Sequence, residues 1–185
     1  MKFFLCILVL SFATMQELVV ADKRGPFDAN MCCNAEKSEP DSAAHEALKE
    51  ALGGCKKELG SEMKEGKFHI GKYACMMECI SKKMNVIDAN GNINETEFTD
   101  SVKKFASGDY QKAVAEDIAK KCIAGAKTAI DNGAKGDNEC SFTAMKMKYC
   151  VGKEMFNACP ADKQDTSDQC VELRKITNGE KPKEE

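Results

Sequence analysis

The sequence contains no tryptophan, only 4 prolines and only 2 histidines among its 185 residues. This composition excludes a collagen-like chain, and 43% hydrophobic residues exclude a low-complexity one. A basic excess is also missing, because 27 lysines and arginines stand against 30 aspartates and glutamates, for a net charge of −3. A chain without a basic surface has little attraction for phosphate backbones. We therefore expect no nucleic-acid partner.

Long hydrophobic runs are missing after the amino terminus. The run over residues 3–13 follows Lys2 and is too short to span a bilayer, but it has the length of a signal-peptide core. Small residues at Val19-Val20-Ala21 predict cleavage after Ala21, with Ala13 as the alternative site. We expect a signal peptide over 1–21, one domain over 22–177 and a disordered tail over 178–185. The mature protein is then secreted into an extracellular fluid, without stable membrane insertion.

Export determines how the cysteines are interpreted. Loss of Cys6 with the leader leaves ten of the 11 cysteines, an even number, in an oxidising compartment where thiols pair. We expect five disulfides. The spacing Cys-x-x-Cys is missing and histidines are few, so we expect no metal site and no cofactor.

From residue 41 onward the apolar residues recur with helical spacing, and no long stretch alternates like a strand. The pattern predicts an all-α fold, a compact disulfide-stapled bundle of about six helices. The helices are expected to begin near Asp41, Lys72, Asn94, Asp109, Phe142 and Ser167.

Between the second and third of these helices, residues 88–92 contain Asn90-Gly91, which predicts a tight turn. An EF-hand is excluded there, because Ile93 and Thr99 stand where the calcium loop needs glycine and glutamate. Asn94 is expected to cap the next helix and also begins the sequon Asn-Glu-Thr, which makes it a candidate for glycosylation.

Two cysteine pairs are unfavourable on geometric grounds. Cys75 and Cys79 point the same way from one helix, and the neighbours Cys32 and Cys33 are strained as a mutual pair. Each of these four residues should therefore bond to a different segment. Sequence alone leaves the remaining choices among ten cysteines open.

The spacing of the cysteines resembles that of insect odorant-binding proteins. Three residues separate Cys75 from Cys79, 42 separate Cys79 from Cys122, and eight separate Cys150 from Cys159. The six-cysteine signature is assigned to Cys55, Cys75, Cys79, Cys122, Cys150 and Cys159, with Cys33 as the alternative first member. The additional Cys140, Cys159-Pro160 and Cys170 resemble the Plus-C subfamily.

That resemblance implies three bonds, namely Cys55 with Cys79, Cys75 with Cys150 and Cys122 with Cys159. Cys32 and Cys33 are then left for Cys140 and Cys170, in an order that stays open. The resemblance also divides the domain into a Cys-Cys arm over 22–40, a six-cysteine core over 41–159 and a carboxy-terminal extension over 160–177.

The resemblance further implies a secreted carrier with an apolar cavity, which takes odorants, pheromones or similar small hydrophobic molecules through lymph to receptors. Its expected partners are the ligand, an olfactory receptor or another odorant-binding protein, and a second copy in a homodimer. Ten residues on the apolar helix faces are expected to line the cavity: Ile80, Met84, Phe98, Phe105, Val114, Ile118, Phe142, Met145, Tyr149 and Phe156.

Enzymatic function is not expected. In phospholipases A2 a His-Asp pair follows the Cys-Cys sequence, whereas Cys32-Cys33 is followed by Asn34-Ala35 and neither histidine precedes an aspartate. The alternative function is a secreted, disulfide-rich interaction protein without a small-molecule ligand.

Overall fold

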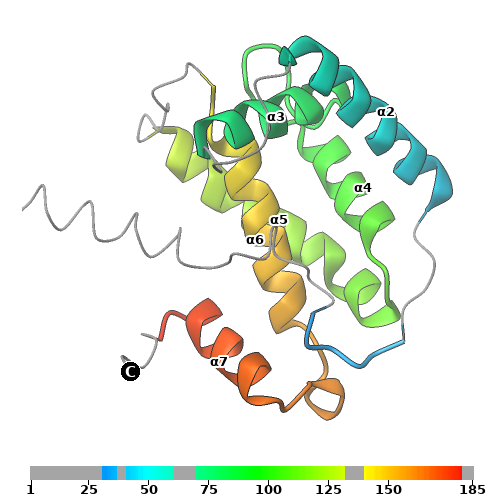
Figure 1. Ribbon diagram of the computed structural model, residues 1–185, viewed down its shortest axis with the longest axis vertical. Helices are drawn as coiled ribbons and strands as arrows, with labels where there is room; N and C mark the ends of the chain where they lie inside the picture. Colours follow the sequence, from blue (N-terminus) through cyan, green and yellow to red (C-terminus); the bar gives the residue numbers. More distant parts are fainter. Residues whose placement is uncertain (1–30, 37–40, 61–69, 132–139, 181–185) are drawn as a thin grey trace, which may run out of the picture.

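The computed structural model describes residues 31–36, 41–60, 70–131 and 140–180. Within these ranges the protein has six α-helices and one 3-10 helix, so the predicted all-α fold is confirmed. The predicted signal peptide lies outside the described residues, as do residues 181–185 of the predicted tail. In chain order the elements are α2 (Ser42–Glu58), α3 (Ile70–Lys83), α4 (Glu95–Phe105), α5 (Asp109–Asp131), α6 (Thr143–Asn157), the 3-10 helix η2 (Ala161–Lys163) and α7 (Asp168–Thr177) (Figure 1).

Side-chain caps fix the beginnings of two helices. The carboxylate of Asp41 accepts a hydrogen bond from the backbone N–H of Ala44 at 3.0 Å, and this cap begins α2. Asn94 accepts in the same way from the N–H of Glu97 at 3.4 Å, as predicted for the start of α4. Both residues satisfy backbone donors that have no partner within the helix.

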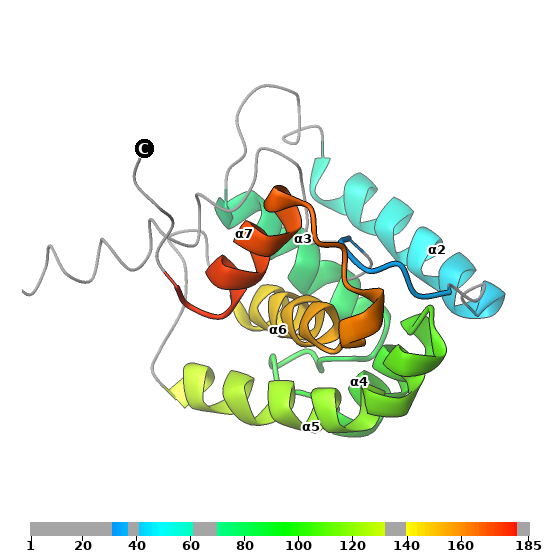
Figure 2. The same ribbon diagram turned by 90° about the horizontal axis from the view of Figure 1, so that it is seen from below.

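The helices form a bundle in which α5 packs beside α4 and α6, and α3 packs against both α2 and α6 (Figures 1 and 2). The main core cluster lies around α4, α5 and α6 and includes Ile87, Phe98, Ile118 and Met147. A second cluster joins α2 to α3 through Ala51, Cys55, Met76 and Ile80. A third cluster surrounds Phe156 near the end of α6.

Three disulfides join the helices of the bundle: Cys55–Cys79, Cys75–Cys140 and Cys122–Cys150. The first has the predicted pairing. The predicted bonds Cys75–Cys150 and Cys122–Cys159 are wrong, because Cys150 lies in α6 opposite Cys122 of α5. Numbered along the chain, the predicted bonds join the first cysteine to the third, the second to the fifth and the fourth to the sixth. The observed bonds follow the same order when Cys140 and Cys150 are counted as the fifth and sixth cysteines.

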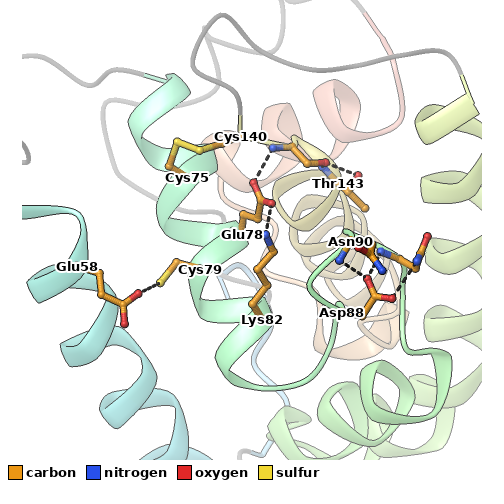
Figure 3. Close-up of polar contacts among 11 residues, drawn as sticks. Glu58, Cys75, Glu78, Cys79, Lys82, Asp88, Asn90, Cys140 and Thr143 are labelled. Carbon is orange, nitrogen blue, oxygen red and sulfur yellow. Dashed lines mark hydrogen bonds and ion pairs between the residues drawn. A yellow bond between two sulfur atoms is a disulfide. The ribbon is translucent and has the colours of Figure 1, made fainter.

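A hydrogen bond one turn along α3 from Cys75 brings the segment of Cys140 close to this helix. Glu78 accepts a hydrogen bond from the backbone N–H of Ser141 at 2.7 Å, which holds the start of α6 against α3 (Figure 3). Lys82 forms an ion pair with the other oxygen of Glu78, at 2.8 Å. Cys140 directly precedes Ser141, so this hydrogen bond places Cys140 next to Cys75.

The two remaining disulfides join the amino-terminal arm to the carboxy-terminal extension, as Cys32–Cys170 and Cys33–Cys159. Cys32 therefore has one of its two predicted partners, whereas the expectation that Cys140 bonds to the arm is wrong. Backbone hydrogen bonds from Asn34 to Lys163 at 2.7 Å and from Asp165 to Cys32 at 3.0 Å hold the two segments side by side. Cys33 thus lies beside the segment that follows α6.

Arg174 of α7 reinforces this junction. Its guanidinium donates hydrogen bonds to the carbonyl oxygens of Cys32 at 2.7 Å and Phe156 at 3.4 Å. It also lies over the ring of Phe156, 4.6 Å from the centroid. One side chain therefore holds the arm, the end of α6 and α7 together.

Candidate functional site: a groove between two helices

A half-open groove with a volume of about 680 Å³ lies between α2, the end of α3 and α4. The neighbouring positions of α2 and α4 can be followed in Figures 1 and 2. Pockets of roughly 300–1,000 Å³ accommodate drug-sized ligands. The groove is lined by Asp41, Ala43, Ala44, Ala47, Glu50, Ala51, Gly54, Lys83, Met84, Asn85, Glu97, Ser101, Lys104 and Phe105.

The wall that α2 contributes has an unusual composition, because most of its side chains are very small. Ala44, Ala47, Ala51 and Gly54 recur three or four residues apart, so they share one face of the helix. A Cβ added to Gly54 would stand only 3.1 Å from Cε of Lys83. Larger residues on this face would fill the space between α2 and α4.

The opposite wall carries the bulkier apolar side chains. Phe105 projects from the last turn of α4, and Met84 follows the end of α3. The ring of Phe105 also approaches the imidazole of His45, with 5.9 Å between ring centroids. Methionine adapts to ligands of different shape because its side chain is flexible and polarisable.

Charged side chains complete the lining of the groove. Asp41, Glu50 and Glu97 contribute negative charges, whereas Lys83 and Lys104 contribute positive ones. Lys83 forms an ion pair with Glu58 at 2.6 Å. The lining therefore combines small and bulky apolar side chains with charged groups of both signs.

A second hollow of about 400 Å³ adjoins the groove, because Asp41 and Lys104 line both. Its other lining residues are Lys103, Ala106 and Lys112. This second hollow is therefore predominantly basic. We refer to it as the lysine hollow.

Lys103 is tied to a neighbouring carboxylate. Its Nζ lies 2.7 Å from Oε2 of Glu116, while Nζ of Lys120 lies 2.8 Å from Oε1 of the same residue. Hydrogen bonds from Lys103 and Lys120, together with their positive charge, lower the pKa of Glu116 to about 2.

The structure does not bring the ten predicted lining residues together. Met84 and Phe105 line the groove. Phe98 and Ile118 are buried in the main cluster, with Val114 packed against it. Ile80 lies in the second cluster, and Phe156 is fully buried in the third.

The other three predicted residues lie on or near α6. Phe142 precedes the helix, Met145 lies in its first turn, and both are partly buried. Tyr149 is 41% exposed. The ten residues predicted to line one cavity therefore lie in several different environments in this fold.

The small face of α2 is the feature of the groove that sequence reasoning missed. The alanines of this helix appear in the sequence as a periodic apolar stripe, which predicts a packed face as readily as an open one. The informative signal is side-chain size, because a face of alanine and glycine fills little volume.

No helix in the described ranges is both long and apolar enough to cross a bilayer. Those ranges also contain no cluster of three or more histidine, cysteine, aspartate or glutamate side chains arranged to hold a metal ion.

Comparison with protein families accounts for the bundle. Residues 37–154, more than half of the chain, match the model of the PBP/GOBP family. The chain belongs to this family. Its members are insect odorant- and pheromone-binding proteins, which are binding proteins rather than enzymes. No curated protein matches the chain.

The limits of the PBP/GOBP match agree with the disulfides. Cys150 lies within the matched residues, whereas Cys159 lies beyond their end at residue 154. The three disulfides of the bundle are thus contained in the family region. The bonds of Cys32 and Cys33 attach segments outside it.

Proposed function

We propose that the protein is a secreted carrier that reversibly binds small hydrophobic molecules in the groove between α2 and α4. The supporting observation is a groove of ligand size within the region that matches a family of odorant- and pheromone-binding proteins. Transfer of a ligand from water into the groove gains roughly 25 cal/mol for each Å² of apolar surface buried. The cargo is expected to include odorants, pheromones or related molecules.

The proposed transport takes place in an extracellular fluid such as sensillum lymph. Five disulfides support this location, because such bonds persist in oxidising compartments. The leader predicted over residues 1–21 supports it as well. An olfactory receptor, another odorant-binding protein and a second copy of the chain are the protein partners that this proposal expects.

We further propose that the chain belongs to the Plus-C subfamily. Two observations support this assignment, the presence of two disulfides beyond the six-cysteine set and proline directly after Cys159. The arm and the extension would then be subfamily additions to a common bundle.

The carrier function is tested by displacement of a hydrophobic fluorescent probe from the oxidised mature protein by volatiles and fatty acids. Ala47→Phe places a ring in the groove and should weaken probe binding about tenfold or more. The control Ala124→Phe adds the same ring to an exposed position of α5 and should change binding less than twofold. Circular dichroism and the Tm establish that both variants are folded.

The alternative of an interaction protein without a small ligand is favoured by one observation. Five of the ten predicted lining residues belong to, or pack against, apolar clusters without lining the groove. Absence of saturable probe binding by a correctly bonded sample would support this alternative. Equal binding by Ala47→Phe and the unmodified protein would show that the groove is not the ligand site.

A further inference from the structure

The groove and the lysine hollow meet at the amino-terminal end of α2, where Asp41 and Lys104 line both. We infer that together they form one site for an elongated anionic amphiphile, such as a long-chain carboxylate. The hydrocarbon chain lies in the groove, and the carboxylate lies among Lys103, Lys104 and Lys112. This inference rests on the proposed carrier function and adds the chemical class of the ligand.

The positions of the lining residues give the site two chemically different ends. An α-helix rises about 1.5 Å per residue, so the small face from Ala44 to Gly54 extends for about 15 Å. Phe105 is adjacent to Lys104 in α4. Met84 directly follows Lys83, whose side chain lies beside Gly54 at the other end of the small face. The apolar path therefore begins beside the lysines and continues away from them.

The charges in the lysine hollow favour an anion. Three lysines line it against the single carboxylate of Asp41, which already accepts the N–H of Ala44. Lys103 is paired with Glu116, whereas Lys104 and Lys112 form no ion pair with the described residues. Both side chains are exposed, so a ligand carboxylate can approach their ammonium groups from solvent.

A neutral ligand of the same length would use only the apolar part of the site. The amphiphile and its methyl ester bury similar hydrocarbon surface, but the ester lacks the charge that the lysines attract. The difference between their affinities therefore isolates the lysine hollow. This attraction should weaken as ionic strength rises, because the lysines are exposed and salt screens their charge.

The experiment compares dodecanoate with methyl dodecanoate by probe displacement from the full oxidised protein, below the concentration at which either aggregates. The double variant Lys104→Ala/Lys112→Ala should lose about three- to tenfold in affinity for dodecanoate, as expected for two exposed ion contacts. Its affinity for the ester should change less than twofold. The control Lys57→Ala/Lys146→Ala removes the same charge from exposed positions elsewhere and should affect neither ligand.

A gain in affinity provides a second test. Glu116→Gln removes the carboxylate that pairs with Lys103, so dodecanoate should bind about twofold or more tightly at low salt. The ester again serves as the control ligand. A variant that only disturbed the fold would weaken both ligands.

Several outcomes would overturn the inference. Unchanged dodecanoate binding by the double lysine variant, or equal losses for acid and ester, would exclude the lysine hollow while leaving the carrier function intact. Binding to anionic phospholipid vesicles without binding of free dodecanoate would assign the lysines to a lipid surface instead. Failure of the unmodified protein to bind the probe or either ligand would overturn the proposed function itself.

Discussion

The Nζ of Lys103 lies 2.7 Å from Oε2 of Glu116, so an ion pair joins the last turn of α4 to α5. Glu116 also pairs with Lys120 one turn further along α5. The same carboxylate therefore connects two helices and partly neutralises the lysine hollow. Its protonation should affect both stability and charge in this region.

The stabilisation provided by Glu116 should depend on pH. Its pKa in the folded protein is about 2, below the ordinary value of 4.5. The stabilisation is therefore fully present above pH 4.5 and is lost as pH falls toward 2. In thermal unfolding, Glu116→Gln should have a lower Tm than the unmodified protein at pH 6, and the difference should shrink below pH 4. Asp100→Asn at an exposed position of α4 is the control, and an equal pH dependence in that variant would contradict the prediction.

The disulfide assignment predicts which peptides remain joined without reductant. Cleavage after methionine at Met76 separates Cys75 from Cys79, and cleavage at Met145 separates Cys140 from Cys150. With additional cleavage after lysine, mass spectrometry should find the peptide of Cys75 attached to that of Cys140. A peptide pair that joins Cys75 to Cys150 would contradict the structure.

Removal of the Arg174 side chain should destabilise the junction between the arm and α7. Arg174→Ala loses two hydrogen bonds and the contact with the ring of Phe156, so the free energy of unfolding should fall by about 2 kcal/mol. Arg174→Lys should restore only part of this loss, because an ammonium cannot reproduce the planar fork. The control Lys175→Ala removes a surface ion pair and should cost less than about 0.5 kcal/mol. Chemical denaturation measures all three, and equal losses in the two alanine variants would argue against the role of Arg174.

Alanine substitutions at two glycines should change the free energy of unfolding in opposite directions. Gly91 has a φ of 87° in the turn after Asp88, and alanine there should cost about 1 kcal/mol because left-handed backbone is unfavourable for residues with a Cβ. Gly125 lies within α5, where an added Cβ meets open space. Gly125→Ala should therefore stabilise the protein by about 0.5–1 kcal/mol. Urea unfolding distinguishes these outcomes, and a stabilising Gly91→Ala would contradict the turn assignment.

The helices were predictable because their signals are local. Helices begin beside Asp41 and Asn94 as expected, and each side chain caps its helix by accepting a backbone N–H only three residues away. Gly53 and Gly54 weaken the helical pattern, yet α2 continues through them to Glu58. The disulfide of the buried Cys55 with Cys79 and the packing of α2 against α3 outweigh the low helix propensity of two glycines.

The disulfides and the groove depend on contacts between distant segments, which local patterns do not encode. The spacing of eight residues between Cys150 and Cys159 predicted the wrong fifth and sixth cysteines of the signature. In the structure Cys140 bonds to Cys75, and the hydrogen bond between Glu78 and Ser141 holds the two segments together. Periodicity identified buried positions such as Phe98 and Ile118 without saying which neighbours they meet. The location of the groove follows from side-chain volume on α2, which hydrophobic periodicity does not report.

The bond between Cys32 and Cys170 also determines how the protein responds to proteolysis. It connects positions near the two ends of the described chain, 138 residues apart in sequence. A protease that cuts the backbone once at any point between them leaves both fragments covalently attached. The nicked protein would keep its full mass under non-reducing conditions and separate into two pieces only when a reductant is added.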